Sequence, residues 1–355
     1  MNFHESCWPD IFSILFIHNN PVMNKACEKG FAVKMENEIY YWGKRRRRAK
    51  LIFNPASGSA NASPVQLMNI ISMLQEWKFI PEVYLTEPDS DYAKMVQETL
   101  VQGVNLFVVC GGDGTISAVA REIAGLPATL GIIPTGTQNN IALSLNIPQD
   151  IPSAISILRL GERVKIDMGM VVYGDMKMPF LEVCSVGLMS SLFSAGDDIQ
   201  HGHFERVGDF LATLVSSTHS KIKLSMDDRR EIVRMGHVVL VTNMPHVGRN
   251  YRVGNKAAFK DGLLDVLLFS NLNKINLLGC ALKGSDISEV EDPRIEHYHV
   301  HKVDIETMPP MQIMADSVPL GTGAVHIEMN RRALAVMLPR SQKENKQARN
   351  QKKND

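Results

Sequence analysis

An alternation of strand-type and helix-type segments between residues 49 and 160 places the strongest limit on how this chain can fold. Apolar runs of strand type lie at 51–53, 83–85, 106–110 and 129–133, and amphipathic helical patterns separate them. Strands that alternate with helices pair in parallel, because each helix returns the chain to the edge at which the previous strand began. The pattern therefore predicts an α/β sheet with helices on both faces and ligands bound beyond the carboxyl ends of the strands.

The pattern changes after residue 161. Between 163 and 335 most segments are short runs of strand type, such as 164–172, 237–242 and 263–269, with turn residues between them. Such a series is typical of a mainly β domain, so we expect a β sandwich to follow the α/β domain.

Composition and cysteine usage agree with a globular protein of about two domains. The chain has 355 residues, of which 45% are hydrophobic and 21% charged. Its five cysteines are widely spaced and form no CxxC pair, as expected of reduced thiols in a cytosol. The apolar run at 11–17 is far shorter than the roughly 18 residues that span a bilayer. We therefore expect a cytoplasmic protein that is neither secreted nor membrane-spanning.

Positive charge is concentrated in two segments, although the whole chain carries 38 basic and 38 acidic side chains. The segment at 44–50 holds six basic residues, and the tail at 340–355 holds six basic and two acidic residues. Two interpretations stay open: solvated flexible segments, or attraction to an anionic membrane surface. A nucleic acid would attract the same charges, but we do not expect one as a partner.

Three loops that contain glycine each follow a predicted strand, and they are the main candidates for a functional site. They read NPASG at 54–58, GGDGT at 111–115 and PTGTQNN at 134–140. Glycine lets the backbone approach an anion closely, and the N–H groups at the start of a helix attract phosphate. Because the carboxyl ends of parallel strands share one edge of the sheet, the three loops predict one binding site for a polyphosphate.

Polar side chains in these loops suit the same ligand. Ser57, Thr115 and Thr137 have hydroxyl groups that can donate to phosphate oxygens, and Asp113 can face a Mg²⁺ ion. The pattern G-x-G-x-x-S at 112–117 is also close to a dinucleotide fingerprint. That fingerprint needs a carboxylate about 20 residues on, where this chain reads GIIP at 131–134, so a dinucleotide is disfavoured.

At these motifs the chain resembles the diacylglycerol kinase and sphingosine kinase family of lipid kinases, most of all its soluble bacterial members. NPASG, GGDGT, PTGTQNNIA, DGLLDV at 261–266 and a closing pattern at 315–339 follow one another in the family's order. The resemblance implies an α/β fold class: an N-terminal three-layer α/β nucleotide-binding domain plus a C-terminal β-sandwich domain, with the last strand returning to the first domain. The implied boundaries are a disordered extension at 1–48, the ATP-binding domain at 49–162 plus 331–339, the lipid-substrate sandwich at 163–330 and a basic disordered tail at 340–355.

The resemblance also implies transfer of the γ-phosphoryl group of ATP to the hydroxyl of a diacylglycerol-like or sphingoid-like lipid. It implies Mg²⁺ held by the carboxylate of Asp261 and the backbone oxygens of Ala258 and Leu263, which suits a cation that prefers oxygen ligands. A lipid substrate implies peripheral contact with the inner membrane surface, and a homodimer is left open. The expected nucleotide-binding residues are Asn54, Ser57, Gly58, Thr86, Gly111, Gly112, Asp113, Gly114, Thr115, Gly136 and Thr137.

Two departures from the family's pattern concern carboxylates. The family usually has Asp-Gly-Glu near the C-terminal end, where this chain reads Asp316, Ser317 and Val318, and it usually has Asp where this chain has Asn140. We expect Asp316 to activate the lipid hydroxyl and Asp113 to organise the metal, and the reverse assignment stays open.

Two other functions stay open. The departures at 140, 317 and 318 favour a catalytically silent relative that binds nucleotide or lipid. A kinase of a soluble acceptor such as NAD shares GGDGT, although NPASG and PTGTQNN argue against it.

Histidines alternate at 297, 299 and 301, which places them on one face of a strand, where imidazoles can bind zinc. We interpret this segment as a solvent-facing strand without a metal, because the neighbouring sequence offers no carboxylate or cysteine to complete a ligand set. His201 and His203 are interpreted as loop residues on the same ground.

Overall fold

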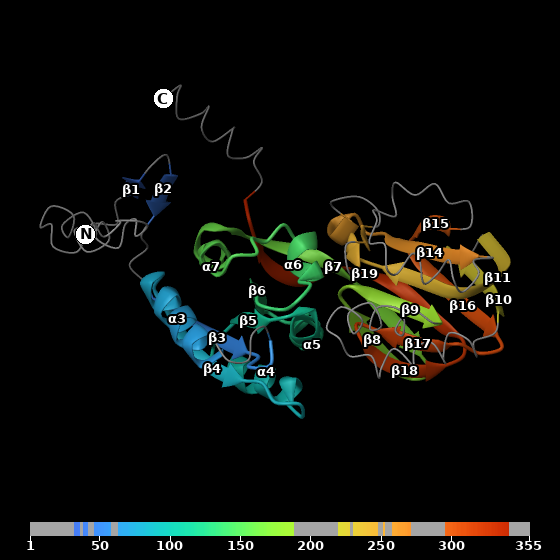
Figure 1. Cartoon of the computed structure of the whole chain (residues 1–355), viewed down its shortest axis with the longest axis horizontal. Helices are drawn as coiled ribbons and strands as arrows, with labels where there is room; N and C mark the ends of the chain where they lie inside the picture. Colours follow the sequence, from blue (N-terminus) through green and yellow to red (C-terminus); the bar gives the residue numbers. More distant parts are fainter. Residues whose placement is uncertain are drawn as a thin grey trace, which may run out of the picture.

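The computed structural model of the chain describes residues 32–35, 38–41, 46–57, 63–187, 219–227, 230–247, 251–252, 258–270 and 295–340. Gly58, His201, His203 and the apolar run at 11–17 lie outside these residues. The described elements form an α/β region and a strand-rich region, which the long strands β7 (Glu162–Tyr173) and β19 (Val325–Leu338) connect (Figure 1).

The α/β region is built on four parallel strands in the order β4, β3, β5, β6. They are β3 (Arg47–Phe53), β4 (Phe79–Leu85), β5 (Leu106–Gly111) and β6 (Thr129–Pro134). Every residue of β5 and β6 is buried, as expected for parallel strands that are covered on both faces.

Among the described residues, helices cover both faces of this sheet: α3 (Ser63–Glu76), α4 (Tyr92–Val101), α5 (Asp113–Ile123), α6 (Asn140–Ser144) and α7 (Ile151–Leu160). Leu51 and Val108 pack with α3 and α7 in one core cluster, whereas Ile52 and Val109 pack with α4, α5 and α6 in another. Alternate strand residues thus face opposite helix layers, which confirms the predicted three-layer domain.

Aspartate caps begin two of these helices. Asp91 accepts a hydrogen bond from the backbone N–H of Lys94 at the start of α4, and Asp150 accepts one from Ser153 at the start of α7. Each bond satisfies one of the N–H groups that a helix leaves unpaired at its first turn. Among the described residues, no helix has both the length and the apolar character needed to cross a bilayer.

The second region is an antiparallel β sandwich, as predicted. Its buried side chains form one apolar cluster that includes Phe180, Leu224, Val241 and Val266. Besides β7 and β19, its elements are β8 (Met176–Phe180), β9 (Val183–Gly187), β10 (Ser220–Met226), β11 (Arg230–Thr242), β12 (His246–Val247), β13 (Tyr251–Arg252), the 3₁₀ turn η2 (Ala258–Lys260), β14 (Leu264–Ser270), β15 (Ile295–Val300), β16 (Lys302–Met308), β17 (Gln312–Ala315) and β18 (Val318–Thr322).

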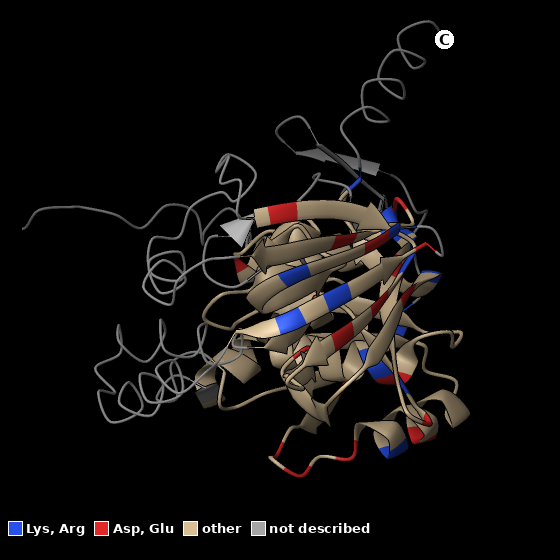
Figure 2. Ribbon diagram, turned by 90° about the vertical axis from the view of Figure 1, so that its right-hand side faces the viewer, with Lys and Arg blue, Asp and Glu red and all other residues tan. Residues whose placement is uncertain are grey.

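Acidic and basic residues lie on neighbouring strands of the sandwich (Figure 2). Lys223 lies 3.2 Å from Glu231, and Arg234 lies 2.8 Å from Glu296. Exposed pairs of this kind add at most about 1 kcal/mol each, so these pairs are typical of a solvated surface.

Strand β19 returns to the first domain, as predicted. Its first half pairs with β16, and its second half lies parallel to β6, with Val336 opposite Leu130. An irregularity between Asn330 and Leu334, with Arg332 at φ +54°, separates the two halves. One sheet therefore runs from the α/β domain into the sandwich and fixes the position of one relative to the other.

The segment predicted as a disordered extension contains regular structure. Strands β1 (Ala32–Met35) and β2 (Glu38–Tyr41) form an antiparallel pair, and β3 begins at Arg47, before the expected boundary. Arg48 donates to the Glu82 carboxylate at 2.6 Å and to the carbonyl oxygen of Gln102 at 2.8 Å. Part of the basic run therefore belongs to the sheet, because its side chains find partners on β4 and at the end of α4.

Candidate active site

The structure brings the three glycine-bearing loops together at the carboxyl ends of β3, β5 and β6. Gly112 and Gly136 meet backbone to backbone: a Cβ atom on Gly136 would lie only 2.5 Å from the Cα atom of Gly112. The N–H group of Thr135 also donates to the carbonyl oxygen of Gly111 at 3.1 Å. Only glycine allows this close approach, so the second and third loops form one surface.

Side chains of the first loop tie it to the other two. The Asn54 amide donates to the Thr115 hydroxyl at 2.9 Å, and the hydroxyl groups of Ser57 and Thr135 lie 3.1 Å apart. Cys110, beneath Thr135, is fully buried, and burial raises the pKa of its thiol to about 12. The thiol therefore stays protonated near neutral pH and is not a candidate nucleophile.

The carboxylate of Asp113 fixes the start of α6. It accepts hydrogen bonds from the backbone N–H groups of Asn140 and Ile141, each at 2.9 Å. Burial raises the pKa of Asp113, and repulsion from the Asp316 carboxylate adds to this effect, while the bonds to Ile141 and Asn140 oppose it. Asp113 thus holds the third loop in place and shares its surroundings with a second carboxylate.

That second carboxylate comes from the sandwich. Asp316 occupies the tight turn between β17 and β18, where it and Ser317 have φ angles of +42° and +66°. Its side chain accepts hydrogen bonds from the N–H groups of Leu181 at 2.6 Å, Glu182 at 2.9 Å and Val183 at 3.0 Å. Burial raises the pKa of Asp316, and its hydrogen bonds oppose this shift. Asp113 and Asp316 therefore form an acidic pair across the domain boundary.

A third acidic residue, Glu182, is not evident as a site residue from the sequence. The Asn140 amide donates to the Glu182 carboxylate at 3.2 Å and to the Gln138 side chain at 3.3 Å. A carboxylate therefore lies beside the position at which this chain has Asn140 in place of the usual Asp. Local sequence carries little signal for it, because a single acid at the start of an apolar strand is ordinary.

The other predicted nucleotide-binding residues lie around the edge of the surface formed by the glycine loops. Thr86 is buried just after β4, the outermost strand of the sheet, and its N–H group donates to the carbonyl oxygen of Phe53. Gly114 and Thr137 are exposed at the loop surface.

Asp261 lies in the turn before β14, where its carboxylate accepts a hydrogen bond from the N–H group of Leu263 at 3.0 Å. Burial raises the pKa of Asp261, and repulsion from Asp265 and Asp167 adds to it, whereas the Leu263 bond opposes it. The Asp261 carboxylate, which lies close to other negative charge, is an oxygen ligand of the kind that Mg²⁺ prefers. The residues present therefore fit the metal that the family implies.

Buried hydrogen bonds connect this turn to the acidic pair. The Asn243 amide donates to the carbonyl oxygens of Asp167 and Leu181, both at 3.0 Å. The Asp167 carboxylate in turn accepts from the N–H groups of Gly262 at 2.9 Å and Arg332 at 2.6 Å. Asn243 thus connects two parts of the site. One is the start of β9, where Asp316 accepts its hydrogen bonds, and the other is the turn before β14, which contains Asp261.

Comparisons with known proteins agree with this architecture. Residues 48–171 match the model of the diacylglycerol kinase catalytic domain, and residues 200–338 match that of the YegS C-terminal NAD kinase beta sandwich-like domain. A crystal structure of a diacylglycerol kinase from Bacillus anthracis str. Sterne superposes with a TM-score of 0.63 at 20% identity, covering 83% of this chain and 98% of that one. This likeness concerns the fold.

Two curated relatives illustrate the range of similarity. An uncharacterized protein of Synechocystis sp. is 23% identical over 315 residues, which are 83% of this chain and 71% of that protein. A diacylglycerol kinase of Staphylococcus saprophyticus is 35% identical over 126 residues, which are 35% of this chain and 41% of the kinase. The chain therefore joins a domain that matches the diacylglycerol kinase catalytic domain to a second domain that matches the YegS-type C-terminal β sandwich.

Proposed function

We propose that this protein is a lipid kinase that transfers the γ-phosphoryl group of ATP to the hydroxyl of a diacylglycerol-like or sphingoid-like lipid. The observation that carries the proposal is the backbone contact between Gly112 and Gly136, with Asp113 beside it and Asp316 facing it from the sandwich. Phosphoryl transfer depends mainly on positioning and electrostatic stabilisation, which such a constellation supplies.

The phosphates of ATP bind the backbone of 111–115 and 136–137 in this proposal. The start of α5, an 11-residue helix, directs N–H groups and its positive dipole end toward this surface. Asn54 and Ser57 keep the loops in place through Thr115 and Thr135, and Thr86 lies at the outer margin. Gly58 stays a prediction outside the described residues.

Mg²⁺ belongs at the turn before β14, held by the Asp261 carboxylate and the backbone oxygens of Ala258 and Leu263. When bound, the ion neutralises phosphate charge that develops during transfer. The role of this chain is to keep the turn rigid, which the bond from Gly262 to Asp167 supports.

Asp316 is our candidate for the group that takes the proton of the lipid hydroxyl. Asp113 is our candidate for the group that would orient a Mg²⁺ ion bound to the ATP phosphates, distinct from the ion at Asp261. A base acts best when its pKa lies near the working pH, and burial raises the pKa of Asp316 in that direction. The three N–H bonds fix the orientation of the Asp316 carboxylate and oppose its full neutralisation.

Glu182 supplies, in this account, the carboxylate that position 140 lacks. Changing Glu182→Gln should lower turnover by about 10-fold or more, which corresponds to roughly 1.4 kcal/mol of transition-state stabilisation. The exchange variant Asn140→Asp/Glu182→Gln returns a carboxylate to the same hydrogen-bonded pair, so it should recover most of the loss. Steady-state kinetics of the single and exchange variants measure both effects. An exchange variant as slow as Glu182→Gln alone would show that the carboxylate at this pair is not what matters.

Peripheral binding to the inner membrane surface is the corresponding proposal for localisation. Arg46 is exposed, whereas Arg47 is partly buried and Arg48 is paired with Glu82. These residues lie at the amino end of β3, opposite the edge that carries the nucleotide loops, so they can attach the domain to a membrane but do not line the site.

Changing Arg45→Ser and Arg46→Ser together should weaken binding to anionic vesicles by about 2 kcal/mol at low salt, since each basic residue near headgroups contributes about 1 kcal/mol. The difference should shrink as salt screens the attraction. Activity on a short-chain, water-soluble lipid should not change. Vesicle sedimentation measures the binding, and equal binding by variant and parent at low ionic strength would mean that these arginines form a solvated linker.

Transfer of label from γ-labelled ATP to a panel of acceptors tests the function itself. Diacylglycerol, monoacylglycerol and a sphingoid base should yield an organic-phase product for at least one member. NAD is included because the sandwich matches a domain described as NAD kinase-like, and an aqueous product from NAD alone would favour that function. ATP binding without transfer to any acceptor would favour a silent relative.

A further inference from the structure

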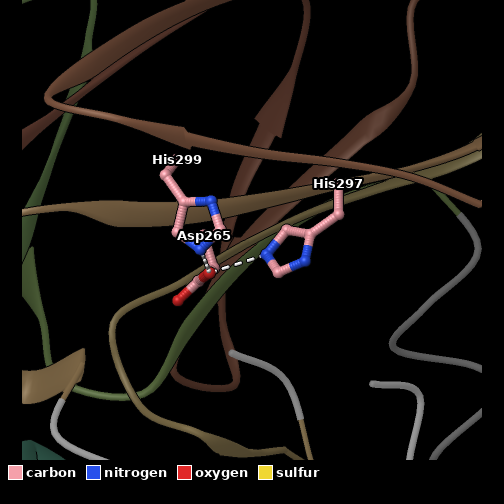
Figure 3. Close-up of side chains that lie close together, drawn as sticks. All are labelled: Asp265, His297 and His299. Atoms are coloured by element: carbon pink, nitrogen blue, oxygen red, sulfur yellow. Dashed lines mark hydrogen bonds and ion pairs between the residues drawn. The ribbon is translucent and has the colours of Figure 1, made fainter. Parts of the chain in front are cut away.

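Two histidines and a buried aspartate meet on the sandwich at the pair of strands β14 and β15 (Figure 3). Asp265 stands opposite His299 in the antiparallel register, and His297 stands two residues further along the same face. The sequence interpretation that no carboxylate is near these histidines was wrong. The carboxylate comes from the DGLLDV motif, more than 30 residues earlier in the chain, and only the strand pairing brings it there.

The three side chains converge on one point. The Nε2 atoms of His297 and His299 lie 2.6 Å and 3.1 Å from the same Asp265 oxygen, and one candidate ligand atom of each residue lies within 4.8 Å of the others. In a tetrahedral zinc site with bonds of about 2.0–2.1 Å, ligand atoms are about 3.3 Å apart. The two histidine–aspartate distances differ from this separation by only about 0.7 Å and 0.2 Å, so small rotations of these side chains bring both pairs to the spacing of a zinc site.

Burial and charge also suit a cation at this point. The Asp265 side chain is 4% exposed, whereas His297 and His299 are 32% and 53% exposed. The carboxylate thus forms the floor of a site that solvent can reach from the histidine side. Asp261 lies near enough to repel Asp265, which makes the surroundings more negative.

We propose that Asp265, His297 and His299 form a binding site for a divalent transition metal, with Zn²⁺ the best match. Two imidazoles and one carboxylate are a common three-ligand set for zinc, and imidazole nitrogen favours zinc over Mg²⁺. The fourth position stays open for water. The site is separate from the Mg²⁺ site at Asp261, and the bound ion joins β14 to β15 directly after the turn that carries Asp261.

His301 does not join this set. Its Nδ1 atom lies 3.0 Å from the carbonyl oxygen of Gly262, beyond the end of β15. Of the three alternating histidines, His297 and His299 are therefore the proposed ligands, and His301 contacts the turn before β14.

Titration of the full-length, chelator-treated protein with Zn²⁺ by calorimetry, and with Co²⁺ by visible absorption, tests the site. We expect one equivalent of metal, the absorption bands of four-coordinate cobalt, and a melting temperature that rises with Zn²⁺. His297→Ala and His299→Ala should each weaken Zn²⁺ binding by about 100-fold or more, because even residues that only orient a ligand contribute roughly 10–100-fold. An excess of Mg²⁺ should not displace the zinc.

His326→Ala is the matched control. His326 also pairs with carboxylates on a strand surface, at 2.7 Å from Asp304 and 3.6 Å from Glu328, but it brings a single imidazole. The His326→Ala variant should bind Zn²⁺ with the same affinity as the parent protein. The proposal is overturned if the protein binds no zinc, or if folded His297→Ala and His299→Ala variants bind it as tightly as the control. Neither outcome bears on lipid kinase activity, which the acceptor panel tests separately.

Discussion

Changing Asp316→Asn should lower turnover by about 100-fold or more while nucleotide affinity changes little. Asparagine nearly preserves the shape of the side chain but cannot take up a proton. Asp316 belongs to the sandwich, on the turn between β17 and β18, and is not part of the glycine loops that form the nucleotide surface. Steady-state kinetics with the preferred acceptor, together with calorimetric binding of ATP, separate the two effects.

A stability control is needed because three backbone N–H groups converge on this carboxylate. In Asp316→Asn the amide NH₂ group would face one or more of these backbone N–H donors, which should lower the free energy of unfolding by about 1–3 kcal/mol. Asp227→Asn is the matched control: Asp227 has φ +48° and accepts hydrogen bonds from the N–H groups of His301 and Lys302. It should lose stability while retaining turnover. A folded Asp316→Asn protein with parental turnover would assign proton transfer to another carboxylate, with Asp113 next in line.

The second large effect, a loss of ATP affinity, is expected at the contact between the loops 111–115 and 134–140. A Cβ atom on Gly136 would lie 2.5 Å from the Cα atom of Gly112 and 3.0 Å from Oδ1 of Asn139, so Gly136→Ala must push the loops apart. On Gly112 the Cβ atom would lie 3.2 Å from the Cα atom of Gly136, and the larger side chain of Gly112→Val extends this conflict. Both variants should fold and bind ATP about 100-fold more weakly, since displacing binding groups by about 1 Å can have that effect.

Gly103→Ala distinguishes this effect from a general loss of stability. Gly103 follows α4 at φ +76°, and no atom lies within 4 Å of the place that a Cβ atom would take there. Alanine at this position therefore strains the backbone by about 1–2 kcal/mol without touching the loops. Its ATP affinity should equal that of the parent. Parental affinity in a folded Gly136→Ala protein would remove the loop contact from the nucleotide site.

The parts of the fold that can be predicted from sequence are those that depend on local periodicity. Apolar runs such as 106–110 and 129–133 predict parallel strands, and β5 and β6 lie there, buried on both faces. The three loops can be grouped because parallel strands end at the same edge of a sheet. Strand β3 begins at Arg47, earlier than the apolar run at 51–53 predicts. Four successive arginines show no alternation of apolar and polar residues, so sequence pattern alone does not assign Arg47 and Arg48 to a strand.

The parts that cannot be predicted depend on partners far apart in the chain. Asp316 bonds the backbone at 181–183, more than 130 residues away, and Glu182 meets Asn140 across the domain boundary. Asp265 meets His297 and His299 only in the register that β14 and β15 adopt. A shift of one residue would turn these side chains to opposite faces, so local sequence alone cannot specify such contacts.

The most direct test of the central claim is to incubate the full-length protein with γ-labelled ATP, Mg²⁺ and a total lipid extract, and to identify labelled products by mass spectrometry. We expect a phosphorylated lipid from the parent protein and almost none from a folded Asp113→Asn variant. ATP binding by the parent with no labelled lipid in the whole extract would contradict the central claim.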